Sequence, residues 1–159
     1  MNQVGIGYDV HQFKEGRPLF LGGVEIPHSR GLDGHSDADA LIHAVCDAVF
    51  GAIGEPDIGH FFPNDDPEWK DKPSRVFLER AALEVVRKKG KIINIDSTVI
   101  AEEPKISAYI QKMREAMAHA LAMNPSKITV KATTNERMGF VGRGEGIAAM
   151  AVASVELPE

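Results

Sequence analysis

The stretch Val4-Gly-Ile-Gly-Tyr-Asp-Val-His11 sets the first element of the fold, because apolar and other residues alternate along it. A period of two predicts a β-strand, since successive side chains of a strand leave on opposite faces. We expect the apolar face to pack against the core; it consists of Val4, Ile6, Tyr8 and Val10. The opposite face holds two glycines, which should leave open space beside Asp9 and His11.

The rest of the chain alternates between expected strands and helices. A short strand pair is expected over 19–26, broken at Gly22-Gly23, with further strands over 92–100, 127–134 and 146–157. Helices are expected over 36–52, 74–89 and 104–123, the first with Ser36 as its N-cap. These patterns predict an α+β fold in which helices pack on one face of a mixed β-sheet.

Composition limits the classes of protein to which the chain can belong. With 159 residues, 43% of them hydrophobic and 26% charged, we expect one domain over 1–159. The net charge of −5 and the lack of a basic run argue against nucleic acid as a partner. No apolar run is long enough for a membrane span and no leader peptide precedes the first strand, so we expect a cytoplasmic location. Cys46, the only cysteine, fits a reducing compartment.

Asp9, His11 and His43 form a candidate metal site. Asp9 and His11 leave the same strand face, and His43 lies on the polar side of the first expected helix. Zinc accepts a carboxylate and two imidazoles, and a three-ligand site keeps a fourth position open for water or substrate. A carboxylate one turn away, Asp39 or Asp47, is expected to orient the other ring nitrogen of His43. The residues alone leave a second interpretation open, in which all three are ordinary solvated side chains.

Two segments near the C-terminus carry phosphate-like patterns. Segment 142–146 is glycine-rich but runs into an apolar strand, so no helix N-terminus follows to hold a phosphate. We expect a turn there, with Arg143 and Glu145 paired or solvated. Segment 131–136 contains two threonines and Glu136, which suit phosphate oxygens and Mg²⁺ or Mn²⁺. An ordinary strand end followed by a turn explains the same residues.

Several separated motifs resemble, in order and along nearly the whole chain, those of the 2-C-methyl-D-erythritol 2,4-cyclodiphosphate synthase family. They are Gly7-Tyr-Asp-Val-His11, Gly34-His-Ser-Asp-Ala-Asp-Ala-Leu-Ile-His43, Asp57-Ile-Gly59, Phe62-Pro63, Pro104-Lys105, Lys131-Ala-Thr-Thr134 and Gly139-Phe-Val-Gly-Arg-Gly-Glu-Gly146. The resemblance implies a single catalytic domain that assembles as a homotrimer, with active sites between subunits.

The resemblance also implies a reaction in the non-mevalonate isoprenoid pathway. The 2-phosphate of 4-diphosphocytidyl-2-C-methyl-D-erythritol 2-phosphate attacks the β-phosphorus, which releases CMP and 2-C-methyl-D-erythritol 2,4-cyclodiphosphate. Asp9, His11 and His43 would bind Zn²⁺. Glu136 would bind a second ion, Mg²⁺ or Mn²⁺, that bridges the substrate phosphates.

Further residue roles follow from the resemblance. His35 and Thr134 would stabilise the transition state, while Asp57 and Gly59 would hold either the ribose or the erythritol. Segments 101–107 and 132–133 would form the cytidine pocket. Phe140 and Arg143 would line a central channel of the trimer that accepts an isoprenoid diphosphate. The implied substrate contacts are Asp9, His11, His35, Ser36, Asp57, Ile58, Gly59, Phe62, Asp66, Ala101, Lys105, Ile106, Ser107, Ala132, Thr133, Thr134, Glu136, Phe140 and Arg143.

The chain departs from the family pattern at three places. Asn64 stands where relatives often have Asp, so only Asp66 of that acidic turn is carried over. Tyr8 stands where relatives commonly have Phe, and it would add a hydroxyl near the central cavity of the implied trimer. Glu102-Glu103 places negative charge beside a pocket for an anion.

Two other functions fit parts of the sequence. A zinc hydrolase would use the open coordination position to activate water. A non-catalytic, nucleotide-binding oligomeric module would use His43 only for structure.

Overall fold

The computed structural model describes all residues, 1–159, and is built around a five-stranded sheet. The strand order is β4 (Arg30–Leu32), β1 (Asn2–Glu15), β7 (Gly146–Glu156), β5 (Lys91–Ile100) and β6 (Ile128–Thr133). Only β5 and β6 are parallel, and the other neighbours are antiparallel. The predicted strand pair is present as β2 (Leu19–Leu21) and β3 (Val24–Ile26), which turn at Gly22-Gly23.

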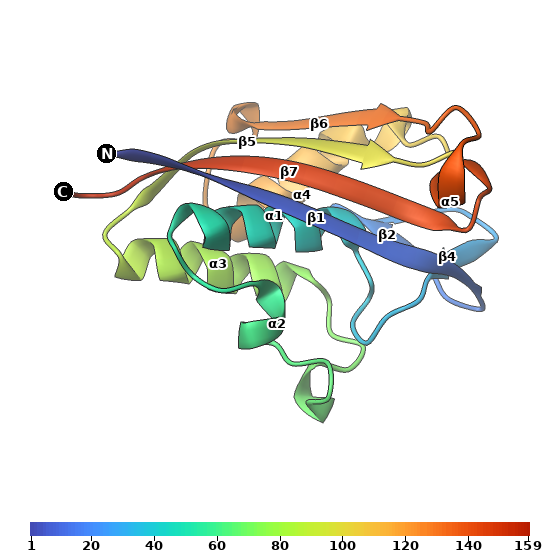
Figure 1. Cartoon of the computed structure of the whole chain (residues 1–159), viewed down its shortest axis with the longest axis horizontal. Helices are drawn as coiled ribbons and strands as arrows, with labels where there is room; N and C mark the ends of the chain where they lie inside the picture. Colours follow the sequence, from blue (N-terminus) through green and yellow to red (C-terminus); the bar gives the residue numbers. More distant parts are fainter.

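The three long helices pack on one face of this sheet (Figure 1). They are α1 (Ala40–Ala52), α3 (Arg75–Arg87) and α4 (Ile110–Leu121), and α1 packs directly on β1 and β7. A short helix, α2 (Ile58–Phe61), follows α1, and another, α5 (Gly139–Gly142), directly precedes β7. Turns of 3₁₀ helix occupy 67–69, 107–109 and 125–127. The prediction of an α+β fold with helices on one face of a mixed sheet is therefore confirmed. No helix has the length and apolar character needed to cross a bilayer.

The structure reverses the prediction for the two faces of β1. The four side chains assigned to the core are exposed in the single chain, by 67% for Val4 and Ile6; the others are Tyr8 and Val10. The opposite face is buried under α1, so the glycines leave no open space. A Cβ on Gly7 would lie 1.8 Å from the carbonyl oxygen of Ala44. Glycine is required because the helix backbone approaches the strand so closely.

Two helices begin later than their sequence patterns predict. The helix expected from residue 104 begins at Ile110, after the 3₁₀ turn over 107–109. The helix expected from Ser36 begins at Ala40, and its N-cap is Asp39 rather than Ser36.

Asp39 can cap α1 because its buried carboxylate has three backbone donors within reach. It accepts hydrogen bonds from the N–H groups of Ile42 (3.0 Å), Gly22 (2.9 Å) and Gly23 (2.7 Å). Burial, and then the negative charge of Asp37, raise the pKa of Asp39 to about 6, against the three N–H groups, which lower it. Asp39 therefore ties the β2–β3 turn to the start of α1.

Candidate metal centre and active site

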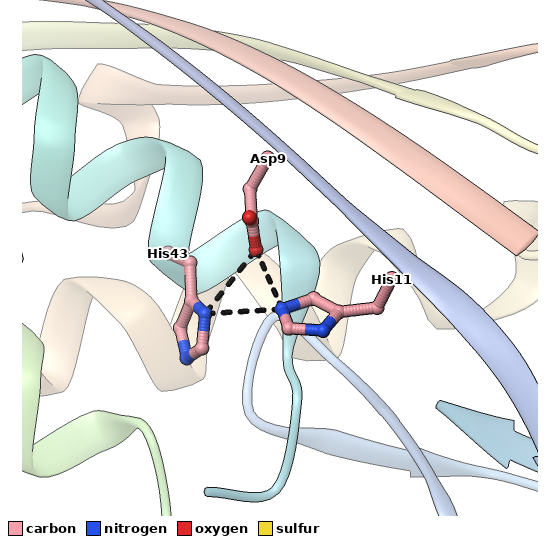
Figure 2. A group of neighbouring side chains, drawn as sticks. All are labelled: Asp9, His11 and His43. Carbon is pink, nitrogen blue, oxygen red and sulfur yellow. Dashed lines mark hydrogen bonds and ion pairs between the residues drawn. The ribbon is translucent and has the colours of Figure 1, made fainter. Parts of the chain in front are cut away.

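The structure brings Asp9, His11 and His43 together, as predicted, with one donor atom of each pointing into a shared space (Figure 2). Asp9 Oδ2 lies 2.8 Å from His11 Nε2 and 3.2 Å from His43 Nδ1, and the two nitrogens are 3.3 Å apart. A tetrahedral zinc with bonds of about 2.0–2.1 Å places its ligand atoms roughly 3.3 Å from one another. The three donors therefore fit a zinc-sized ion with only small adjustments.

Hydrogen bonds on the far side of each imidazole favour the tautomer that a metal requires. His11 Nδ1 donates to the carbonyl oxygen of Asp33 at 2.8 Å, which leaves the lone pair of Nε2 facing the centre. His43 Nε2 lies 2.9 Å from Ser74 Oγ, while its Nδ1 faces Asp9. Outer hydrogen bonds of this kind fix the ring orientation of histidine ligands.

The group that contacts the outer nitrogen of His43 is not the predicted carboxylate. Asp39 is occupied as the cap of α1, and Asp47 accepts a hydrogen bond from the N–H of Ile58 at 2.8 Å. Ser74 takes their place because α3 begins directly beside His43. The sequence marked Ser74 only as the start of a helix, and no local spacing links it to His43.

The charges in the cluster favour a bound cation. Burial raises the pKa of Asp9, but His11 and His43 outweigh it and hold the pKa at about 2. Burial lowers the pKa of His11, but Asp9 outweighs it and the net pKa is raised. Asp9 Oδ2 is buried and has no well-directed hydrogen bond, although two ring nitrogens lie close. A divalent ion at the centre would satisfy this oxygen and both nitrogens at once.

The segment before α1 places Ser36 next to the cluster. Ser36 Oγ lies 3.2 Å from His43 Nε2, and the guanidinium of Arg17 donates to the carbonyl oxygens of Gly34 (2.7 Å) and Ser36 (2.5 Å). Arg17 thereby fixes the backbone of this segment beside the metal centre.

The acidic turn over 62–67 contacts the segment before α1. His35 Nε2 is 2.8 Å from the carbonyl oxygen of Asp66, which joins this turn to the segment before α1. Asp57 caps α2 through the N–H of His60 at 3.2 Å, and Gly59 lies within α2. Phe62 is buried against Trp69 and Phe77, so its ring supports the site from within the core.

The expected cytidine-binding segments line one pocket of about 190 Å³. The predicted residues that line it are Ala101, Lys105, Ile106, Ser107, Ala132, Thr133 and Thr134, and Val99, Glu102 and Pro104 complete the lining. A separate cavity of about 750 Å³ lies between the C-terminal ends of α3 and α4 and contains none of the predicted site residues.

Glu102 has a structural explanation that the sequence did not supply. Its Oε1 accepts hydrogen bonds from the backbone N–H groups of Asn135 (3.0 Å) and Arg137 (3.1 Å). Glu136 lies between them, and both Glu136 and Arg137 have positive φ, at 51° and 60°. Glu102 therefore holds the unusual backbone that presents Glu136 to solvent.

The loop before β7 carries the last two predicted residues. Phe140, in α5, is 42% exposed, and Arg143 forms an ion pair with Glu145 at 2.9 Å. The pairing of Arg143 with Glu145 in a turn, one of the two arrangements expected from the sequence, is thus present.

The metal cluster and the pocket lie apart within one chain. Strand register places Asp9 opposite Ala149, Ala149 opposite Val99, and Val99 opposite Ala132. Adjacent strands are about 4.8 Å apart, so Asp9 and Ala132 are separated by roughly 14 Å across the sheet. Glu136 likewise lies outside the group formed by Asp9, His11 and His43.

Known proteins with similar sequences and folds span the whole chain. 2-C-Methyl-D-erythritol 2,4-cyclodiphosphate synthase of Akkermansia muciniphila is 54% identical over 156 residues, 98% of this chain and 92% of that protein. The structure of bifunctional IspDF from Campylobacter jejuni superposes with a TM-score of 0.95 at 40% identity, and covers all of this chain but only 43% of its own. IspF of Plasmodium falciparum in complex with CDP gives a TM-score of 0.86 at 34% identity, covering 99% of this chain and 97% of its own.

The pattern of the YgbB family matches residues 2–156, which is nearly the entire sequence. Relatives at more than half identity carry the synthase name over their full length. The chain therefore belongs to the YgbB family, that of the 2-C-methyl-D-erythritol 2,4-cyclodiphosphate synthases.

Proposed function

We propose that this chain converts 4-diphosphocytidyl-2-C-methyl-D-erythritol 2-phosphate into 2-C-methyl-D-erythritol 2,4-cyclodiphosphate and CMP, with residues 1–159 as a single catalytic domain. Family membership supports the reaction, since the synthase relatives match the chain over nearly its whole length. The observation that carries the proposal is the Asp9, His11 and His43 cluster, because its donors have zinc spacing.

The proposed ions are Zn²⁺ at this cluster and Mg²⁺ or Mn²⁺ at Glu136. Bound there, zinc would hold and polarise a phosphate group, and the second ion would neutralise charge on the departing CMP. Two imidazoles and one carboxylate suit zinc, whereas a lone carboxylate needs phosphate oxygens to complete the shell of a harder ion. Glu102 supports the second site by fixing the backbone on both sides of Glu136.

The chemistry requires positioning more than proton removal. The nucleophile is a phosphate oxygen that is already ionised at neutral pH, so no general base must activate it. His35 and Ser36 are proposed to hold the phosphate beside the metal cluster, and Thr134 to stabilise charge at the other end of the diphosphate. Alignment and charge neutralisation account for most of the catalysis expected in phosphoryl transfer.

We further propose a homotrimer whose active sites lie between subunits. The exposed apolar face of the sheet supports assembly, since a large apolar patch on a soluble chain marks an interface; it includes Val4, Ile6, Tyr8, Val10, Met150 and Val152. The roughly 14 Å between Asp9 and Ala132 supports shared sites, because a second copy can bring its pocket to the cluster. Phe140 and Arg143 are proposed to line the central channel and bind an isoprenoid diphosphate.

A zinc hydrolase would use the same three ligands, and isotope incorporation separates the two reactions. When the reaction runs in ¹⁸O-labelled water, hydrolysis places one labelled oxygen in a phosphate product. Cyclisation consumes no water, so mass spectrometry of both products should find no label. A labelled product would contradict the proposed cyclisation and favour the hydrolase.

A further inference from the structure

We propose that Ser74 and Asp37 are positioning residues that hold His43 in the tautomer and orientation needed for metal binding. The inference rests on the proposed metal role of Asp9, His11 and His43, and it is independent of which reaction follows. Neither Ser74 nor Asp37 belongs to the expected set of metal or substrate contacts.

Ser74 departs from the usual behaviour of a serine at a helix start. It occupies the N-cap of α3 and is fully buried, yet its hydroxyl forms no capping hydrogen bond. A serine at this position normally uses its oxygen to accept from the N–H groups of the first turn. Here the oxygen lies 2.9 Å from His43 Nε2 instead. Because Ser74 makes this contact in place of the usual capping hydrogen bond, we infer that it has a role at the neighbouring site.

Asp37 determines the direction of that hydrogen bond. The Ser74 hydroxyl donates to Asp37 Oδ1, and the Ser74 backbone N–H donates to Asp37 Oδ2 at 2.8 Å. A carboxylate can only accept, so the hydroxyl proton is committed to Asp37. The oxygen of Ser74 is then free only to accept, which requires a proton on His43 Nε2. With its one proton there, neutral His43 presents the lone pair of Nδ1 to Asp9 and His11.

The pair is held firmly between two elements. Asp37 Oδ1 also accepts from the N–H of Asp39 at 3.1 Å, and the N–H of Asp37 donates to the carbonyl oxygen of Lys72 at 3.2 Å. These bonds connect the segment before α1 to the start of α3. Ser36 Oγ also approaches His43 Nε2, but at 3.2 Å and without a carboxylate to orient its proton, so it imposes no tautomer.

The test compares Ser74→Ala and Asp37→Asn with a matched control. Ser97→Ala removes another buried serine hydroxyl, one that donates to the carbonyl oxygen of Thr129 within the sheet. Zinc affinity is measured by competition with a chromophoric chelator. The tautomer of His43 is read from the ¹⁵N shifts of its ring in the metal-free protein. Loss of an outer-shell partner of a histidine ligand typically weakens metal binding by about 10–100-fold.

We expect both site variants to weaken zinc binding by roughly 10–100-fold and to populate the second tautomer of His43, while Ser97→Ala changes neither property. Unchanged zinc affinity and tautomer in Ser74→Ala would overturn the proposal. An equal loss of affinity in Ser97→Ala would also overturn it, because the effect would then follow from general destabilisation. Failure of the unaltered protein to bind zinc would instead refute the metal site itself. The tautomer of His43, measured in the metal-free protein, would still show whether Ser74 and Asp37 orient the ring.

Discussion

Replacing Gly7 by alanine should drive α1 away from β1 and separate His43 from its two partners. The added Cβ would lie 1.8 Å from the carbonyl oxygen of Ala44 and 2.9 Å from the backbone nitrogen of Ala48. Both obstacles are helix backbone, so no side chain can rotate to make room. Because His43 directly precedes Ala44, any movement of this turn also moves the metal ligand.

The required movement can be worked out from the structure. A Cβ contact below 3.0 Å is essentially never tolerated, so the helix must retreat by at least 3.0 − 1.8 = 1.2 Å at Ala44. Metal-ligand distances tolerate changes of about 0.2 Å, several times less than this displacement. Overpacking of this kind also costs roughly 1–3 kcal/mol of folding free energy. We therefore expect zinc affinity to fall at least tenfold and the protein to be less stable.

Gly51→Ala is the matched control, because Gly51 lies on α1 and faces β1 farther along the same contact. A Cβ there has its nearest neighbour, the Cα of Gly5, at an ordinary 3.7 Å. We expect this variant to bind zinc normally and to gain up to about 1 kcal/mol from the better helix propensity of alanine. Chelator competition gives the zinc affinity and thermal unfolding gives the stability of each variant. Wild-type zinc affinity in Gly7→Ala would refute the view that close packing of α1 on β1 sets the metal geometry.

Three further substitutions and a pH series test other parts of the site. His43→Ala should abolish zinc binding and turnover but leave a folded trimer by circular dichroism and sedimentation; normal turnover would refute its assignment as a ligand. Glu136→Gln should weaken the apparent affinity for Mg²⁺ or Mn²⁺ in activity titrations, and Glu102→Ala should do so to a smaller extent by releasing the loop; unchanged titrations would count against both roles. Asp9 raises the pKa of His11 in the metal-free protein, so protons compete with zinc more strongly as the pH falls. The stabilisation by zinc, measured as the difference in melting temperature between loaded and metal-free protein, should therefore grow as the pH rises from 5 to 8, and a constant difference would contradict this linkage.

Strand and helix periodicity made Asp9, His11 and His43 candidate metal ligands, and the family resemblance favoured that interpretation over solvated side chains; the structure brings the three together. Asp9 and His11 share a strand face by their spacing of two, and His43 lies on the helix that packs across that strand. The motif order along the chain predicted the family, and the α+β sheet with helices on one face followed from the alternation of elements.

Periodicity could not tell which face of β1 packs inside the chain. Val4 and Ile6 belong to the more apolar face of β1. On the opposite face, Gly5 and Gly7 lack side chains, so the backbone of α1 can approach the strand closely. In the proposed trimer both faces are buried, one by α1 and the other by assembly. A hydrophobic pattern predicts that a face is buried, but it does not show whether the same chain or another subunit covers it. A single sequence therefore cannot determine which face of β1 packs against α1.

Contacts between distant segments were also beyond the sequence. Ser74 and Asp37 are 37 residues apart in the sequence. Glu102 accepts a hydrogen bond from the N–H of Asn135, which lies 33 residues away. In the sequence Ser74 marks only the start of a helix, and Glu102 has no local explanation. Their roles emerge only when the fold brings α3 beside α1 and places the 134–137 loop beside Glu102.

The reaction products test the central claim most directly. The purified chain, supplied with Zn²⁺ and Mg²⁺ or Mn²⁺, is incubated with 4-diphosphocytidyl-2-C-methyl-D-erythritol 2-phosphate and followed by phosphorus NMR. We predict that CMP and 2-C-methyl-D-erythritol 2,4-cyclodiphosphate appear in equal amounts and that a chelator stops the reaction. A linear phosphate product, or unconsumed substrate in the presence of both metal ions, would contradict the proposed function.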